Sequence, residues 1–142
     1  MVQNQAFKIA FVDGMGGGLA AQVINQLAKQ LPREVEIIGL GTNAAATAAM
    51  VKAGADKGAT GENAICFSVQ NADLIVGPIG IVLPNAMLGE ISPQIATAIA
   101  SAKGKKILIP VSQNHVQIVG LENKSLTHLV KETVAQILES SV

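Results

Sequence analysis

The stretch Phe7–Gly18, FKIAFVDGMGGG, decides the fold of this chain. Its first half is an almost wholly apolar run, typical of a strand that is covered on both faces. Its second half places four glycines in five positions, and each glycine costs roughly 0.5–1 kcal/mol more than alanine to order. Residues 19–31 follow with apolar side chains at three- and four-residue steps, which mark one face of a helix. A strand, a glycine turn and a helix in this order usually bring the backbone close to a phosphate group.

The rest of the chain repeats this alternation of strand and helix patterns. Further strands are expected at residues 34–40, 73–76 and 106–110, and further helices at 44–53, 92–102 and 126–138. Such alternation predicts an α/β fold, a three-layer Rossmann-like sandwich with a mostly parallel sheet of about five strands.

Residues 116–119 are expected to form the fifth strand. Only residues 111–115 separate it from the fourth strand, which is too short for a helical crossover, so we expect it to pair antiparallel at an edge of the sheet. Residues 58–71 carry a weaker pattern, in which Thr60 is expected to cap a short helix with Glu62 in its first turn.

The composition excludes several classes of protein. The 142 residues are 49% hydrophobic and 14% charged, which is the opposite of a disordered chain and predicts one domain over residues 1–142. The ten basic and ten acidic residues cancel, and no basic cluster occurs. With three Phe and no Trp or Tyr, the chain also lacks a platform for stacking bases. Nucleic-acid binding is therefore disfavoured.

The same sequence indicates a cytoplasmic protein. Cys66 is the single cysteine and cannot form an internal disulfide, which favours a reducing compartment. Residues 1–6 lack the layout of a secretory signal. No apolar run reaches the roughly 18 residues that a membrane span requires, so no membrane association is expected. The spacing of His and Cys residues predicts no zinc site.

In a parallel sheet, ligands bind beyond the carboxyl ends of the strands. The predicted loops at these ends are small or polar, and neutral apart from Asp13 and His115. The candidate binding residues in the first three loops are Asp13, Gly14, Met15, Gly16, Gly17, Gly18 and Leu19, then Gly41, Thr42 and Asn43, then Gly77, Pro78, Ile79 and Gly80. The fourth loop is Ser112–His115, and Glu62 and Asn63 lie in a further polar segment near this rim.

The first loop resembles the Rossmann dinucleotide fingerprint. Gly14 and Gly16 occupy the first two glycine positions, whereas the third position falls on Leu19 and departs from the pattern. Exposed amides from Gly16 to Leu19, at the positive end of the helix, would hold a phosphate. The alternative is that these glycines only allow the first helix to pack tightly on the sheet.

The second loop argues against ordinary NAD use. A dinucleotide fold places Asp or Glu there for the ribose hydroxyls, or Arg for a 2′-phosphate, whereas Gly41-Thr42-Asn43 offers only neutral donors. Asn43 either binds the ligand or caps the following helix. The residues do not identify the cofactor, and a nucleotide such as NAD(P) is the best guess.

No catalytic constellation stands out. Asp13 holds Mg²⁺, touches a ribose or, on the simplest interpretation, orients the glycine loop by accepting its amides. Glu62, Glu90 and His115 are candidate proton carriers, and each is also explained as a cap or turn residue. Neither a nucleophile elbow nor a Gly-Lys-Ser/Thr motif occurs in the sequence.

Several of these motifs together resemble a family of small bacterial proteins known only as a domain of unknown function. The motifs are VDGMGGG at 12–18, LGTNA at 40–44, GATGENA at 58–64, GPIGI at 77–81 and MLGE at 87–90, so the likeness spans nearly the whole chain. The family brings no established activity. The resemblance implies that the polar loops belong to one family-specific site on a domain that stands alone.

Three hypotheses for the function follow. The leading one is a small domain that binds or senses a nucleotide or dinucleotide on the glycine turn. The second is a small reductase or phosphate-ester transferase that uses Asp13, Glu62, Glu90 or His115. The third is a structural or interaction subunit, because the alanine-rich helix and the apolar segment 79–88 would bury a partner surface or form a homodimer.

Overall fold

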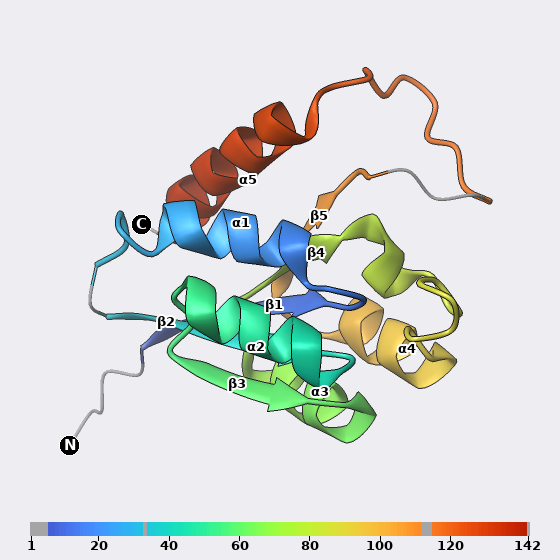
Figure 1. Ribbon diagram of the computed structural model, residues 1–142, viewed down its shortest axis with the longest axis horizontal. Helices are drawn as coiled ribbons and strands as arrows, with labels where there is room; N and C mark the ends of the chain where they lie inside the picture. The colour runs from blue at the N-terminus through green and yellow to red at the C-terminus, as the bar shows by residue number, and fades with distance from the viewer. Residues whose placement is uncertain (1–5, 33, 112–114, 142) are drawn as a thin grey trace.

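A computed structural model describes residues 6–32, 34–111 and 115–141 (Figure 1). Strands and helices alternate along the chain, as the sequence predicts. The elements are β1 (Phe7–Asp13), α1 (Gly18–Leu27), β2 (Val35–Gly41), α2 (Ala44–Ala53), β3 (Lys57–Thr60), α3 (Glu62–Ser68), η1 (Val69–Asn71), β4 (Leu74–Pro78), η2 (Ile79–Val82), α4 (Pro93–Ser101), β5 (Lys105–Ile109) and α5 (Leu126–Ser140).

The five strands form one sheet in the order β3-β2-β1-β4-β5, and every neighbouring pair is parallel. Helices α1, α2 and α5 cover one face of the sheet, and α3 and α4 cover the other (Figure 1). The α/β architecture with a parallel sheet between helical layers is therefore confirmed. The chain runs outward from β1 through β2 to β3 and then returns to β4, so the strand order reverses between β1 and β4.

The central strand β1 supplies both hydrophobic cores. Ile9 and Phe11 are fully buried against α1, α2 and α5, whereas Ala10 and Val12 are fully buried against α3 and α4. Successive side chains of a strand point to opposite faces, so an unbroken apolar run is what a strand in this position requires.

The fifth strand lies where the sequence did not indicate one. Residues 57–60 form β3 at an edge of the sheet, whereas 116–119 form no strand of that sheet, so the predicted antiparallel edge is wrong. β3 is short and mostly exposed, and for that reason it carries no apolar run. At the opposite edge Pro110 follows β5, and proline has no N–H to continue a ladder of hydrogen bonds.

Of two helix starts that the sequence predicted from capping residues, one is confirmed. Ser92 caps α4 by accepting the Ile95 N–H at 3.2 Å, with Pro93 as the first helical residue. Thr60 does not cap α3, whose N-cap is Gly61.

Within the described residues, no helix combines the length and apolar character needed to cross a bilayer.

Candidate functional site

The carboxyl ends of β1, β2 and β4 meet at one edge of the sheet, the right-hand edge in Figure 1. Asp13 at the end of β1 lies in register with Gly41 at the end of β2, and the Thr42 N–H donates to the Asp13 carbonyl at 3.0 Å. Pro78 ends β4. The loops that follow these strands therefore come together, as parallel strands require.

Asp13 is buried beneath the glycine turn. Its Oδ1 accepts the Gly14 N–H at 2.8 Å, and its Oδ2 accepts the Ala20 N–H in the first turn of α1 at 3.0 Å. Burial raises the pKa of Asp13, the hydrogen bonds from Ala20 and Gly14 oppose this rise, and the nearby Glu90 carboxylate adds to it. Among the roles expected for Asp13, these contacts support orientation of the loop.

The four glycines of the turn fall into two groups. A Cβ at Gly14 would lie 2.7 Å from the Met87 sulfur, and a Cβ at Gly17, where φ is +71°, would lie 2.8 Å from the backbone of α2. Close packing and, at Gly17, a left-handed conformation explain these two glycines. Among the described residues, no atom lies within 4 Å of a Cβ placed at Gly16 or Gly18. Packing therefore accounts for only half of the glycine cluster.

The two open glycines lie where α1 begins. Across the described parts of the chain, no protein group accepts a hydrogen bond from the amides of Gly16, Gly18 and Leu19, which we call the turn amides. The helix also has no side-chain cap at its N-cap, Gly17. The first N–H groups of a helix carry a partial positive charge. The turn amides are therefore available to an anion.

An open cavity of about 310 Å³ lies beside the turn amides. Its wall is the whole turn from Asp13 to Leu19 together with four apolar side chains, Pro78, Met87, Val111 and Leu126. The cavity lies over the place where the strand order reverses, which is where open α/β sheets bind their ligands. The sequence did not indicate the last three side chains, because they lie far apart along the chain and no local pattern connects them.

Glu90 fills the other side of the turn, toward β2. Its Oε1 accepts the Met15 N–H at 3.0 Å, the Asn43 side-chain amide at 2.8 Å and the Thr42 hydroxyl. The hydrogen bond from Thr42, followed by that from Met15, lowers the pKa of Glu90. Asn43 also caps α2 by accepting the Ala46 N–H at 2.9 Å. The loop that was expected to face a ligand thus faces a carboxylate of the same chain.

The other predicted residues at the ends of β2 and β4 serve packing. A Cβ at Gly41 would collide with α2, and a Cβ at Gly77 would collide with the backbone of β1. Ile79 and Gly80 begin η2 and do not line the cavity. Of the predicted residues after β4, only Pro78 borders the cavity.

The candidate proton carriers are scattered. Glu62 accepts a hydrogen bond from the N-cap residue of α4, and Asn63 beside it is exposed. His115 lines a separate cavity of about 500 Å³. Asp13 is the one candidate acid that borders the cavity at the turn. Ser112–Asn114 of the fourth predicted loop lie outside the described residues.

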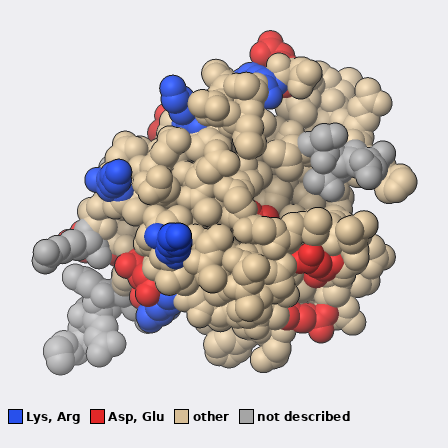
Figure 2. All heavy atoms as spheres, in the orientation of Figure 1, with Lys and Arg blue, Asp and Glu red and all other residues tan. Residues whose placement is uncertain are grey.

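The charges near the turn constrain its chemistry. On the face shown in Figure 2, Lys and Arg side chains lie toward the left and the top, together with some acidic side chains, whereas the charged side chains toward the right-hand edge are acidic. An anion at the turn amides would therefore be held by neutral N–H groups and the helix dipole, without a salt bridge from this face. In the part of the chain that is described, no three His, Cys, Asp or Glu side chains gather closely enough to hold a metal ion.

Comparison with known proteins places the chain in a family. Residues 8–141 match the family described as "Domain of unknown function (DUF3842)", so the chain belongs to this family and the resemblance seen in its motifs is confirmed. No curated protein matches the sequence.

The fold is similar to the crystal structure of a dodecameric FMN-dependent UbiX-like decarboxylase from Escherichia coli O157:H7. The TM-score is 0.51 at 15% sequence identity, and the match covers 93% of this chain and 92% of that chain. At this identity the likeness concerns the fold, a parallel sheet between layers of helices.

Proposed function

We propose that this member of the DUF3842 family binds a phosphorylated nucleotide, with the phosphate on the turn amides. The observation that carries the proposal is that these three amides lack an acceptor among the described residues and border an open cavity. Packing against the described residues also does not require glycine at positions 16 and 18. A side chain at either position would stand where phosphate oxygens approach, which gives both glycines a reason to be there.

The position of the cavity favours a mononucleotide over a dinucleotide. In Rossmann folds a dinucleotide lies across the crevice at the glycine turn, with one half on each side. In this protein Glu90 occupies the β2 side, and the cavity lies on the β4 side. Its apolar side chains Pro78, Val111 and Leu126 suit an aromatic ring system. Because the enzyme with the similar fold is FMN-dependent, FMN is the first candidate ligand.

Neutral donors are sufficient for this task. A hydrogen bond to a charged group contributes about 1.5–3 kcal/mol, and the three turn amides lie at the positive end of α1. Both carboxylate oxygens of Asp13 accept backbone N–H groups of the turn, from Gly14 and Ala20, so this charge is already hydrogen-bonded within the protein. These two features support phosphate binding at a turn without a cationic side chain.

The test is a titration of the protein with FMN, followed by flavin fluorescence, with FAD, NADH, AMP and inorganic phosphate in parallel. Gly18→Asp places a carboxylate where the phosphate would bind. Because Gly18 is the first residue of α1 and its Cβ direction is open, the acid suits the helix dipole and should not lower the Tm. We expect FMN binding to weaken at least about tenfold.

Gln94→Asp is the matched control, since it places the same charge in the first turn of α4 on the opposite layer. This variant should bind FMN as the wild type does. Equal weakening by both variants would attribute the effect to net charge and contradict the proposed contact. Absence of binding by every probe at millimolar concentration would overturn the proposed function.

A separate observation supports a homo-oligomer. Leu88 and Val119 are 94% and 98% exposed, and the neighbouring Val116, Ile118 and Leu121 are exposed as well. Large apolar side chains gathered on a surface mark interaction sites. Sedimentation velocity should show an oligomer for the wild type and smaller species for Val119→Lys, whereas a wild-type monomer would contradict this proposal.

A further inference from the structure

Three hydrogen-bond donors converge on one oxygen atom beside the glycine turn. The donors are the Met15 N–H, the Thr42 hydroxyl and the Asn43 side-chain amide, and the oxygen is Oε1 of Glu90. The donors belong to the loops after β1 and β2, which in Rossmann-type sheets face the phosphates and ribose of a nucleotide. Neutral donors that converge in this way bind an anionic oxygen. In this protein the anionic oxygen comes from the chain itself.

Glu90 reaches this place on a strained segment, residues 83–91, which we call the strap. Asn85, Met87 and Leu88 all have positive φ although none is glycine. Such a conformation costs of order 1–3 kcal/mol per residue and persists only where the surrounding contacts enforce it. The bonds to Glu90 are contacts of this kind, because they tie the end of the strap to the loops after β1 and β2.

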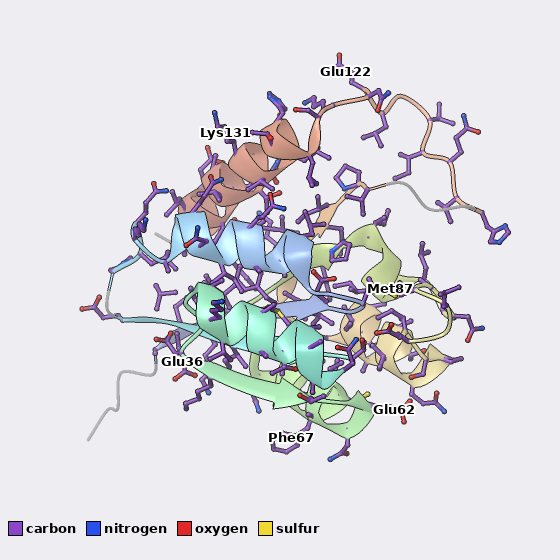
Figure 3. The ribbon with its side chains drawn as sticks, viewed as in Figure 1. Glu36, Glu62, Phe67, Met87, Glu122 and Lys131 are labelled. Atoms are coloured by element: carbon purple, nitrogen blue, oxygen red, sulfur yellow. The ribbon has the colours of Figure 1, made fainter. Side chains whose placement is uncertain are left out.

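The strap lies directly on the glycine turn, and Figure 3 shows Met87 beside the loop that follows β1. A Cβ at Gly14 would lie 2.7 Å from Met87 Sδ and 3.1 Å from Glu90 Oε1. Gly14 is therefore the glycine that admits the strap, whereas Gly16 and Gly18 face open space. Glu90 of the strap contacts the turn on the side of β2, and the cavity lies on the side of β4.

We infer that Glu90 is an internal occupant of a second anion subsite, and that the strap thereby limits the ligand to a single phosphate group. This inference rests on the proposed function, and it names the ligand class as mononucleotides, with the pyrophosphate-bridged dinucleotides excluded. The Glu90 carboxylate takes the donors that a second phosphate would need and repels its charge. The hydrogen bonds that lower the pKa of Glu90 keep the carboxylate ionised.

The experiment follows backbone and side-chain amides by ¹⁵N–¹H correlation spectra, with inorganic phosphate and pyrophosphate as probes. In the wild type, both probes should shift the turn amides and leave the Met15 N–H and the Asn43 side-chain amide unshifted. In Glu90→Ala, pyrophosphate should shift these two groups as well. Its affinity relative to phosphate should rise at least about tenfold, because charge-assisted hydrogen bonds become available to the second phosphate.

Two further variants serve as controls. Glu90→Gln keeps an acceptor oxygen for the three donors but loses the charge, so the pyrophosphate-to-phosphate affinity ratio should rise less than in Glu90→Ala. Glu122→Ala removes an exposed carboxylate far from the turn and should leave the ratio unchanged (Figure 3). If the spectrum of Glu90→Ala loses its dispersion, this variant has not folded, and Glu90→Gln then provides the test. An unchanged pyrophosphate-to-phosphate affinity ratio in Glu90→Gln overturns the inference.

The two proposals fail in different ways. Turn amides that shift while Met15 and Asn43 stay silent in Glu90→Ala would overturn the second subsite and leave the proposed function standing. Turn amides that stay silent in every variant, while Met15 and Asn43 respond in Glu90→Ala, would overturn the proposed function and support the subsite.

Discussion

The two sides of the glycine turn differ in what satisfies their hydrogen-bond donors. On the β2 side, the donors of Met15, Thr42 and Asn43 all meet Glu90 Oε1. On the β4 side, the turn amides meet no acceptor within the described chain and border a cavity. Met15 and the turn amides nevertheless belong to the same loop, the one that follows β1. The difference shows that a glycine-rich turn can be half structural and half open, and that only the open half is a candidate site.

The glycines follow the same division. Gly14 makes room for the strap and Gly17 makes room for α2, whereas no neighbour among the described residues requires glycine at positions 16 and 18. A motif that reads as one unit in the sequence therefore carries two separate constraints. Substitutions that separate these constraints test the comparison directly.

The largest expected effect is that of Gly17→Ala. Its positive φ and a Cβ 2.8 Å from the α2 backbone should lower the free energy of unfolding by about 2–3 kcal/mol. Gly16→Ala has neither penalty, and we expect a change within about 0.5 kcal/mol. Urea unfolding measures both variants. Equal destabilisation by the two substitutions would remove the distinction between packed and open glycines.

A smaller effect is expected for Asp13→Asn. Asparagine offers one acceptor oxygen where Asp13 serves both Gly14 and Ala20, so one buried N–H loses its partner. We expect the free energy of unfolding to fall by about 1–2 kcal/mol. Part of the loss of the hydrogen bond is offset, because the substitution also removes a buried acid. Asp73→Asn is the control, since the exposed Asp73 accepts a single N–H from Lys8 and its variant should change by less than about 0.5 kcal/mol. An Asp13→Asn protein as stable as this control would show that the carboxylate does not order the turn.

The smallest expected effect is a pH dependence. The lowered pKa of Glu90 means that its stabilisation is present above the usual glutamate range and is lost as the pH falls through the folded value. Glu90→Gln should therefore be less stable than the wild type at neutral pH. The difference should be under about 1 kcal/mol, because the Glu90 carboxylate is largely solvated. The difference should shrink toward about pH 3. A difference that is constant with pH would show that the charge of Glu90 does not stabilise the strap.

The contribution of Asp13 to stability changes with pH in the opposite direction, and it gives an internal check on that measurement. Burial raises its pKa, so its contribution to stability is greatest below the usual aspartate range and declines as the pH rises through the folded value. Glu90→Gln leaves Asp13 in place apart from the small effect of the Glu90 charge. The decline due to Asp13 should therefore appear in both proteins.

Much of the fold could be predicted, because its elements carry local signals. β1 is an apolar run since it is covered on both faces, and Ser92-Pro93 marks the start of α4 as expected. The strand β3 could not be predicted, since an exposed edge strand of four residues has no such run. Residues 116–119 were misleading for the converse reason, because their apolar side chains lie exposed outside the sheet.

The candidate site could be predicted only in part. The loops after β1, β2 and β4 were correctly expected to meet, since parallel strands end at one edge. The partner of Thr42 and Asn43 could not be found from spacing, because Glu90 reaches them from beyond β4 on the strap. Met87, Val111 and Leu126 meet at the cavity although each lies in a different part of the chain.

By itself, the sequence determined the α/β alternation, the glycine turn and the buried central strand, because each depends on residues that are neighbours along the chain. The tertiary structure alone decided which amides of the turn have partners, because the partners arrive from distant segments. Hydrogen-bond satisfaction is a property of atoms that meet in space. Only the folded chain distinguishes Gly14, pressed against the strap, from Gly18, which faces open space at the start of α1.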